Sequence, residues 1–110
     1  MDNKIYKKGD IIFVKNIVFE NGIRDTRIKG HPYLLLEDVL YIGQEVKTLK
    51  ITSKEKPNYP QIRLRKGILK KISYINLSNE YNIRIEREGF PYAHIDIEKY
   101  LRNYNSIIFR

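Results

Sequence analysis

The chain has 110 residues, of which 42% are hydrophobic and 31% are charged, a balance typical of a packed globular chain and not of a disordered one. This length suits one domain and leaves no room for a second independent core, so a two-domain enzyme is excluded and residues 1–110 are expected to form a single domain. Twenty-one Lys and Arg against 13 Asp and Glu give a net charge of +8, concentrated in residues 1–30 and 61–90. This charge favours a phosphate-rich or strongly acidic partner, although codon bias toward Lys is an alternative source of part of it.

Several kinds of site are excluded by what the chain lacks. Without Cys there is no disulfide framework, no thiolate zinc site and no cysteine nucleophile, which is in keeping with a reducing cytoplasm. Two His cannot form a three-histidine metal site, and we expect no metal and no other cofactor. The longest stretch without a charged residue, 72–79, has 8 residues, whereas a membrane-spanning helix needs about 20 apolar ones. We therefore expect neither a membrane span nor a signal peptide.

Two strands are expected in the first part of the chain. The apolar, β-branched run after Gly9 predicts a strand over 10–17. A long charged loop with an Asn-Gly turn signal is expected from Phe19 to Gly30. His31-Pro32 then leads into a second apolar strand that an acidic pair ends at 37–38; proline is tolerated at the entrance of a strand.

The middle of the chain alternates with a period of two. This alternation predicts a strand over 45–52, which places Thr52 at the strand end, and another over 61–66, in which Arg63 and Arg65 point away from the core. Residues 54–60 between them read as a loop.

The last part of the chain changes from strand to helix. Gly67 precedes a fifth strand over 72–77, and 83–86 is either a sixth strand or its continuation, with Gly89 and Pro91 ending the β region. An apolar stripe of period 3.6 predicts a helix over about 96–108. This order indicates a mainly β protein with a C-terminal α-helix, in the form of a small, partly open barrel of SH3-like type.

Candidate chemical groups follow from these positions. His31 at a strand entrance can move protons near neutral pH, and the hydroxyls and ammonium of Thr52, Ser53 and Lys54 can hold a phosphate. Arg63 and Arg65 offer forked donors to phosphates. Each signal has a plain alternative, namely a partly packed histidine, a polar strand end or a solvated sheet face. His94 is expected to be an ordinary surface or capping residue.

An ordered set of short motifs resembles the MazF/PemK family of bacterial toxins. The set comprises Lys8-Gly9-Asp10-Ile11-Ile12-Phe13-Val14, Lys29-Gly30-His31-Pro32-Tyr33-Leu34-Leu35-Leu36-Glu37-Asp38, Leu49-Lys50-Ile51-Thr52-Ser53, the segment Gly67 to Leu77, and the final helix. The resemblance covers roughly residues 7–108, and its specificity comes from the order of the motifs because each alone is short.

The resemblance implies a homodimeric SH3-like barrel that cleaves single-stranded RNA without a metal, through attack of the ribose 2′-hydroxyl that leaves a cyclic phosphate and a 5′-hydroxyl. The family's usual catalytic pair is an Arg directly before the Pro and a Thr at the strand end. Thr52 matches, whereas His31 occupies the Arg position. Either His31 is the general acid or base, with Arg27 or Lys29 supplying fixed charge, or the change leaves a protein that binds without cutting. We expect activity.

The resemblance also implies an antitoxin whose acidic flexible tail covers the RNA groove, which the charge of +8 would attract. Our hypothesis for the RNA path is a set of cations and a hydroxyl: Lys15, Lys29, Ser53, Lys54, Arg63 and Arg65. Two other functions remain open. One is a barrel that binds nucleic acid or protein without chemistry. The other is a gyrase poison, as in a toxin family that shares this barrel, for which residues 106–110 would matter more than Thr52.

Overall fold

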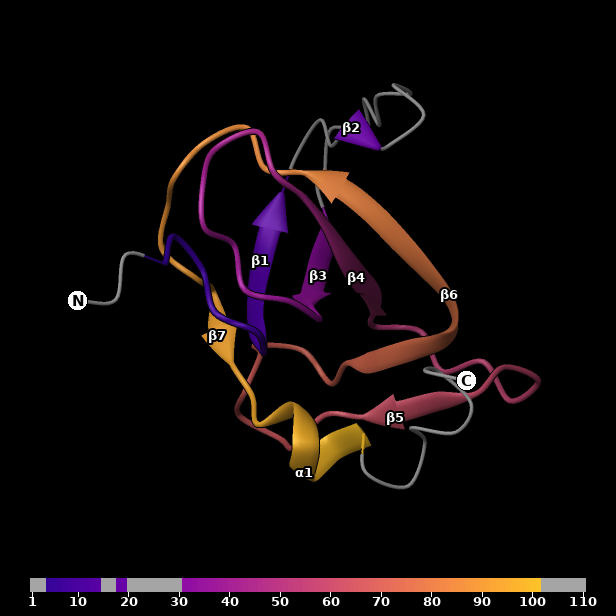
Figure 1. The fold of residues 1–110 in the computed structure, drawn as a ribbon. Coiled ribbons are helices and arrows are strands. Elements are labelled where there is room, and N and C mark those ends of the chain that lie inside the picture. Colours follow the sequence, from indigo (N-terminus) through magenta and orange to yellow (C-terminus); the bar gives the residue numbers. More distant parts are fainter. Residues whose placement is uncertain (1–3, 15–17, 20–30, 102–110) are drawn as a thin grey trace.

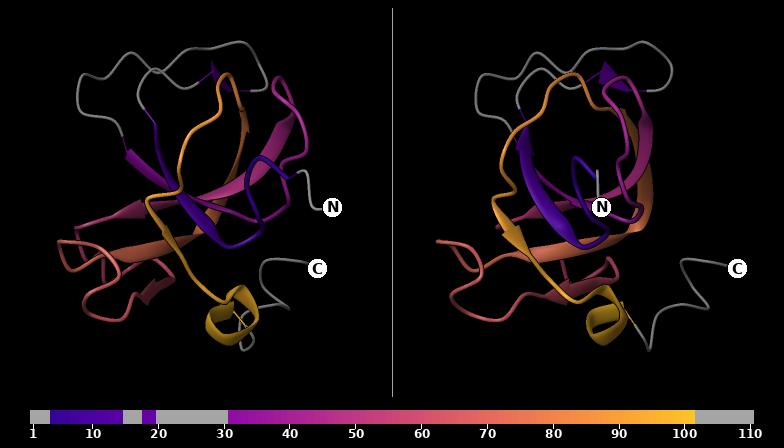
Figure 2. Two further views of the ribbon diagram at one scale, coloured as in Figure 1. Left: turned by 90° about the vertical axis from the view of Figure 1, so that its left-hand side faces the viewer. Right: turned by 60° about the vertical axis from the view of Figure 1, so that its left-hand side comes forward.

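The computed structural model describes residues 4–14, 18–19 and 31–101, and Figure 1 shows their arrangement. The strands are β1 (Asp10–Val14), β2 (Val18–Phe19), β3 (His31–Leu35), β4 (Glu45–Thr52), β5 (Gln61–Arg63), β6 (Tyr74–Arg84) and β7 (Ala93–His94), and the helix is α1 (Ile97–Leu101). They form one antiparallel sheet in the order β2-β6-β4-β3-β1-β7, with β5 also paired to β6. The sheet is strongly curled into a half-barrel (Figure 2), so the expectation of a mainly β fold with a C-terminal α-helix is confirmed.

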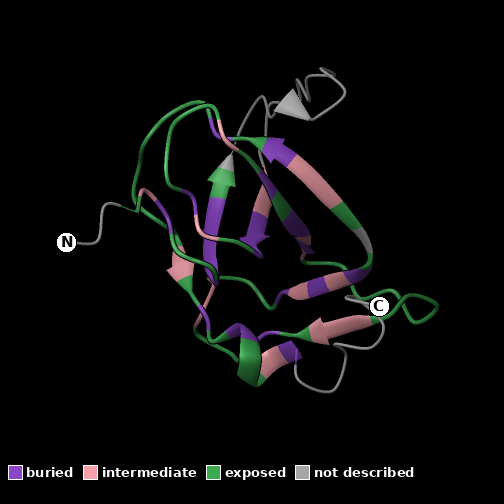
Figure 3. Ribbon diagram, viewed as in Figure 1, coloured by how far each residue is buried: buried purple, intermediate pink, exposed green. Residues whose placement is uncertain are grey.

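Unbroken apolar runs in β1 and β3 reflect burial on both faces of the sheet. Neighbouring residues of a strand point to opposite faces, and here they enter two different core clusters. Ile11 and Leu34 belong to the cluster that also takes up α1, whereas Ile12 and Tyr33 belong to the other. The buried segments therefore run through the central strands and the exposed ones through the loops, as Figure 3 shows.

The strand β6 is one bent element of 11 residues. Its first part pairs with β5 and with the end of β4, and its second part pairs with the start of β4 and with β2. The register with β4 shifts between Leu49 and Ile51, where four residues of β6 lie opposite one of β4. Such a bulge bends a strand and increases its twist, which lets one strand take part in both halves of a curled sheet. Of the two alternatives for 83–86, continuation is confirmed.

Two of the predicted boundaries are wrong, and a third lies outside the described residues. β4 matches the expected strand 45–52. β5 was expected to reach residue 66 but ends at Arg63, and after it, among the described residues, only the hydrogen bond from the Leu64 N–H to the Ser73 carbonyl continues the pairing. The β region does not end at Pro91, since β7 pairs with β1 through Asp10–His94 and Ile11–Ala93. Residues 15–17 of the first predicted strand lie outside the described residues.

The helix α1 begins where the sequence places it. The Asp96 carboxylate accepts a hydrogen bond from the Lys99 N–H at 3.3 Å, as a helix N-cap does, and Ile97 and Leu101 are buried in the core. The rest of the predicted helix, 102–108, lies outside the described residues. Within the part of the chain that the structure describes, no helix has the length and apolar character to cross a membrane.

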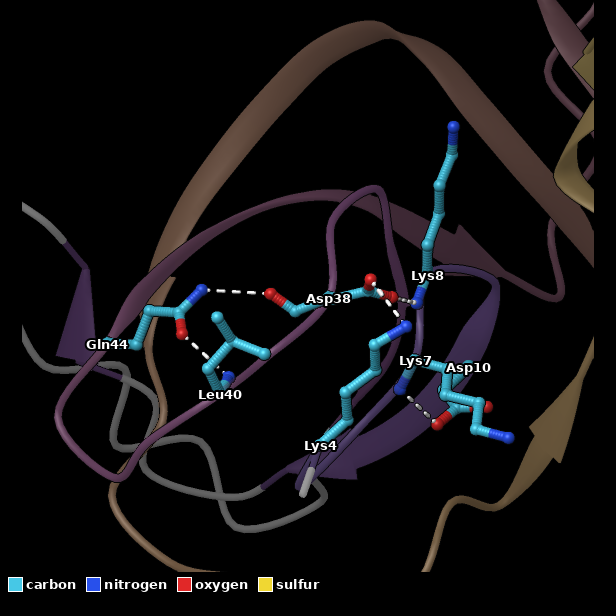
Figure 4. A network of polar contacts seen from close by, with 7 residues as sticks. All are labelled: Lys4, Lys7, Lys8, Asp10, Asp38, Leu40 and Gln44. Carbon is cyan, nitrogen blue, oxygen red and sulfur yellow. Dashed lines mark hydrogen bonds and ion pairs between the residues drawn. The ribbon is translucent and has the colours of Figure 1, made fainter. Parts of the chain in front are cut away.

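The N-terminal segment is fastened to the β3–β4 connection by a polar network (Figure 4). Asp38 accepts a hydrogen bond from the Lys8 N–H at 2.8 Å and an ion pair from Lys4 at 3.0 Å, and these two contacts, in that order, lower the pKa of its carboxyl. Gln44 closes the connection through the Leu40 N–H and the Asp38 carbonyl. This network holds the β3–β4 connection in place beside the N-terminal segment.

Candidate functional site

The register of β3 and β4 brings His31 and Thr52 to the same end of the sheet. The two antiparallel strands pair through Leu35–Thr48, Leu34–Leu49 and Tyr33–Lys50, where the ladder ends. His31 lies two residues beyond Tyr33 and Thr52 two residues beyond Lys50, so both extend past the last pair at the same end. Because strand side chains alternate between faces, both also belong to the face of Tyr33 and Lys50. Both residues are half-buried, so neither is enclosed in the core.

The hydroxyl of Thr52 is held by the turn that follows it. Its Oγ1 accepts a hydrogen bond from the Lys54 N–H at 3.2 Å, a local contact of the kind that Thr makes at strand ends. This bond fixes the oxygen and leaves the hydroxyl proton for another acceptor. Ser53 and Lys54 are exposed beside it. The end of β4 therefore offers one oriented hydroxyl next to the 54–60 loop, which carries Lys54 and Lys56.

Three residues from different strands form a row next to this end. Thr52 of β4 pairs with Tyr74 of β6, which pairs on its other side with Arg63 of β5. Directly paired residues share a face, so a hydroxyl, a phenol and a guanidinium point to the same side of the sheet. Arg63 is exposed and Tyr74 is half-buried. The sequence predicted Thr52 and Arg63 as site residues but missed Tyr74 between them.

Gln61 fastens the 54–60 loop to the same face. Its amide nitrogen donates to the Asn76 side chain at 2.7 Å and to the Lys54 carbonyl at 3.2 Å, while its amide oxygen accepts from the Lys56 N–H at 2.9 Å. The loop in turn carries Tyr59, whose ring lies 5.3 Å from the ammonium of Lys56. The loop is thus bound to the sheet, and it places a cation and an exposed aromatic ring beside the row of three residues.

A shallow hollow lies between this loop and the sheet, lined by residues that include Tyr59, Arg63 and Tyr74. It also contains one carboxylate, Glu55, which accepts a long hydrogen bond of 3.5 Å from the Tyr74 hydroxyl. Forked donors and aromatic faces side by side are the groups that bind the phosphates and bases of single-stranded nucleic acid. The geometry therefore supplies binding groups on the side of the sheet where Thr52 lies.

Three of the predicted site residues, Lys15, Arg27 and Lys29, lie outside the described residues. Arg65 is exposed beyond the end of β5, where its N–H donates to the Tyr100 hydroxyl at 3.2 Å. Of the predicted set, the structure brings Thr52, Ser53, Lys54 and Arg63 together. It places His31 at the matching end of the neighbouring strand.

The sequence missed an aspartate–histidine pair at the other end of β1. His94 Nδ1 lies 2.7 Å from an oxygen of Asp10, whose side chain is 8% exposed, and the other carboxylate oxygen accepts the Lys7 N–H at 2.8 Å. His94 was expected to be an ordinary surface or capping residue; its ring is 54% exposed, but it belongs to β7 and is bound to a buried carboxylate. No local signal could predict a contact between residues 84 positions apart.

This pair is separate from the strand ends of His31 and Thr52. β1 pairs with β3 through Val14–His31, while Asp10 lies at the opposite end of the strand. Four residues of extended chain separate the two ends by roughly 13 Å. The Asp10–His94 pair therefore ties β7 to β1, whereas His31 is the histidine at the end of the sheet that carries Thr52.

In comparisons with known proteins, no protein-family model matched this chain, and neither a curated protein nor a solved structure matched it.

Proposed function

We propose that this protein is a metal-independent endoribonuclease that cleaves single-stranded RNA, built as an SH3-like barrel of the MazF/PemK type. The observation that carries the proposal is the register of β3 and β4, with His31 and Thr52 at one end and on one face of the sheet. The row of Thr52, Tyr74 and Arg63 supports the same reading because it adds phosphate-binding and base-stacking groups.

In the proposed reaction the ribose 2′-oxygen forms a bond to the neighbouring phosphorus, and the bond from phosphorus to the 5′-oxygen breaks. His31 accepts the proton of the 2′-hydroxyl or donates a proton to the leaving 5′-oxygen, as an imidazole can near neutral pH, and water performs the other of these two transfers. Thr52 donates a hydrogen bond from its hydroxyl to a phosphate oxygen as negative charge builds there. The products are a cyclic phosphate and a 5′-hydroxyl.

Arg63 and Lys54 hold the phosphates on either side of the scissile bond in this proposal, and Arg27 or Lys29 supplies further fixed charge. A cytoplasmic homodimer and an acidic antitoxin complete it as a toxin of a toxin–antitoxin system. The net charge of +8 supports an acidic partner, since it would attract a chain of Asp and Glu.

The test is incubation of the purified protein with single-stranded RNA in EDTA, with the ends of the products mapped. We expect cleavage with 5′-hydroxyl ends. His31→Ala should lower the rate by roughly 10²-fold to 10⁴-fold, the range for loss of a general acid or base, and Thr52→Val should also slow it. His94→Ala is the matched control, because its imidazole lies at the other end of β1, and it should cleave at the normal rate.

Two results would overturn this assignment. One is an activity that disappears in EDTA. The other is full activity in a folded His31→Ala variant.

A binding module without chemistry is the second candidate, and the observation that favours it is His31 at the position of the family's Arg. An imidazole lacks the bidentate fork with which a guanidinium clamps a phosphate. Such a protein would bind the RNA through Arg63 and its neighbours and leave every substrate intact. Binding without product ends therefore distinguishes the two functions.

A further inference from the structure

Three adjoining hollows on one side of the molecule share their lining residues. The first, beside the 54–60 loop, includes Arg63; the second includes both Arg63 and Arg65 together with Tyr100; the third includes Arg65 and extends along the 66–72 loop to Tyr92. Because Arg63 belongs to the first two and Arg65 to the last two, the hollows form a continuous series. This series leads away from the end of β4 toward β7.

The charge of this series is one-sided. Its lining contains seven Lys and Arg and one carboxylate, that of Glu55. Within the described residues, none of Arg65, Lys66, Lys70 and Lys71 forms an ion pair. A hollow elsewhere on the surface, next to β6, has two Arg and two Glu instead. Among the described residues, the excess positive charge of this series therefore has no counterpart in the hollow next to β6.

Aromatic rings occur in each of the three hollows. Tyr59 and Tyr74 line the first, Tyr100 the second and Tyr92 the third. Tyr92 is half-exposed and stands 6.1 Å, between ring centroids, from the exposed ring of Phe13. An acidic peptide would need the cations alone, whereas unpaired bases stack on aromatic faces while their phosphates meet the cations. The combination favours a nucleic-acid strand over an acidic protein.

We infer that these three hollows form a binding track for single-stranded RNA several nucleotides long, with the 65–72 loop and Tyr92 as a distal subsite remote from the point of cleavage. The choice of RNA rests on the proposed function. The strand would bind with phosphates along Arg63, Arg65, Lys70 and Lys71 and with bases against the tyrosines. Since the distal subsite lies away from His31 and Thr52, it contributes to affinity and not to the chemical step.

The test measures binding of 2′-O-methyl RNA, which cannot be cleaved by attack of a 2′-hydroxyl, so that affinity is separated from catalysis. The probes are a fluorescent 12-mer and a fluorescent 4-mer. Lys70→Ala/Lys71→Ala should weaken binding of the 12-mer by about tenfold and lower its salt slope by about 1.4, since each phosphate contact on a single strand contributes about 0.7. The 4-mer should bind nearly as before because it can occupy the hollow beside Arg63.

The aromatic part of the track has its own variant. Tyr92→Ala should weaken binding of the 12-mer by about tenfold without lowering the salt slope, because it removes a stacking surface and no charge. The charge-matched control for the lysine pair is Lys47→Ala/Arg87→Ala, two exposed cations that do not line the series. Circular dichroism checks that every variant is folded; Lys70→Gln/Lys71→Gln replaces the alanine pair if it is not.

Each outcome bears on the track separately from the cleavage reaction. Weaker 12-mer binding in Lys70→Ala/Lys71→Ala and in Tyr92→Ala, with no cleavage of ordinary RNA, would support the track and overturn the proposed reaction. Unchanged affinity and salt slope in both of these variants would overturn the track, even if His31→Ala abolishes cleavage. The track would also be overturned if a polyglutamate peptide binds, with an affinity that Lys70→Ala/Lys71→Ala lowers, while the RNA 12-mer does not bind. That result would assign the surface to an acidic protein.

Discussion

Replacing Gly9 by Ala should be far more damaging than replacing Gly43 by Ala, although both glycines have nearly the same backbone conformation. Their φ angles are +95° and +96°, so a side chain at either position is strained by roughly 1–2 kcal/mol. At Gly43 a Cβ would have no atom within 4 Å. At Gly9 it would overlap the carbonyl oxygen of Ile95 and lie 3.1 Å from Cε1 of His94.

The additional loss of stability at Gly9 arises because the backbone of Ile95 must move. The overlapping atom is backbone, so relief requires the segment of Ile95 to shift away from β1. That shift disturbs the hydrogen bond from the Ile95 N–H to the Gly9 carbonyl at 2.9 Å and the contact of His94 with Asp10 at 2.7 Å. A neutral hydrogen bond contributes about 1 kcal/mol and one to a charged group about 1.5 kcal/mol. Gly9→Ala should therefore lower the free energy of unfolding by about 4 kcal/mol, and Gly43→Ala should lower it by about 1.5 kcal/mol.

Urea unfolding of the two variants beside the parent protein measures this difference. A gap of about 2.5 kcal/mol corresponds to a Tm difference of roughly 10 °C or more for a domain of this size. Equal losses at the two positions would refute the reasoning, because the shared φ would then account for the whole effect. The same comparison gives a physical reason for the Gly-Asp pair at the start of β1: the glycine admits the Ile95 backbone, and the aspartate holds His94 beside it.

Three further outcomes are expected. His94→Ala should lower the free energy of unfolding by about 1.5 kcal/mol in thermal unfolding, because the buried Asp10 carboxylate loses a hydrogen bond, and in an Asp10→Ala background the same change should cost much less. Asp38→Asn should destabilise the fold at about pH 7, and in urea titrations its effect should shrink as the pH is lowered below 3.8. The pKa of Asp38 is lowered in the fold, so its stabilisation is present above the ordinary value of 3.8 and is lost as pH falls through the folded value. Arg63→Ala/Arg65→Ala should weaken RNA binding and flatten its salt dependence by about 1.4; an unchanged salt slope would count against both residues.

The parts of the fold that could be predicted are those where burial dictates a local pattern. β4 was predicted to the residue because its period-two alternation places Leu49 and Ile51 in one core cluster and Val46 in the other, with Thr48 also buried. The polar stretch from Ser78 to Asn82 hid the continuity of β6, since alternation stops there while the backbone pairing goes on. β7 has only two residues, and it exists as a strand only because β1 lies beside it.

The same distinction applies to the candidate site: features that depend on local sequence could be predicted, and those that depend on strand pairing could not. Thr52 and Arg63 could be identified because hydroxyls at a strand end and cations on an alternating strand are visible in the sequence. Their common row with Tyr74 could not, because it depends on two separate pairings of β6 that bring residues 52, 74 and 63 side by side. Register between strands is set by tertiary packing, and a shift of one residue would turn Tyr74 to the other face.

The two histidines illustrate how placement, and not residue type, assigns a role. His94 has a buried carboxylate on Nδ1, an arrangement that often orients a catalytic imidazole, but it lies at the end of β1 opposite to Val14 and His31. Acid–base catalysis requires the imidazole within hydrogen-bond reach of the transferred proton, so a single phosphate at the end of β4 cannot use both. His31 belongs to the strand end that matches Thr52, and the basic hollows begin beside the same end of β4 through the row of Tyr74 and Arg63. Under the proposed function, an RNA bound along those hollows would pass Tyr74 and Arg63, which share a row with Thr52, and His31 would be the histidine that acts on it.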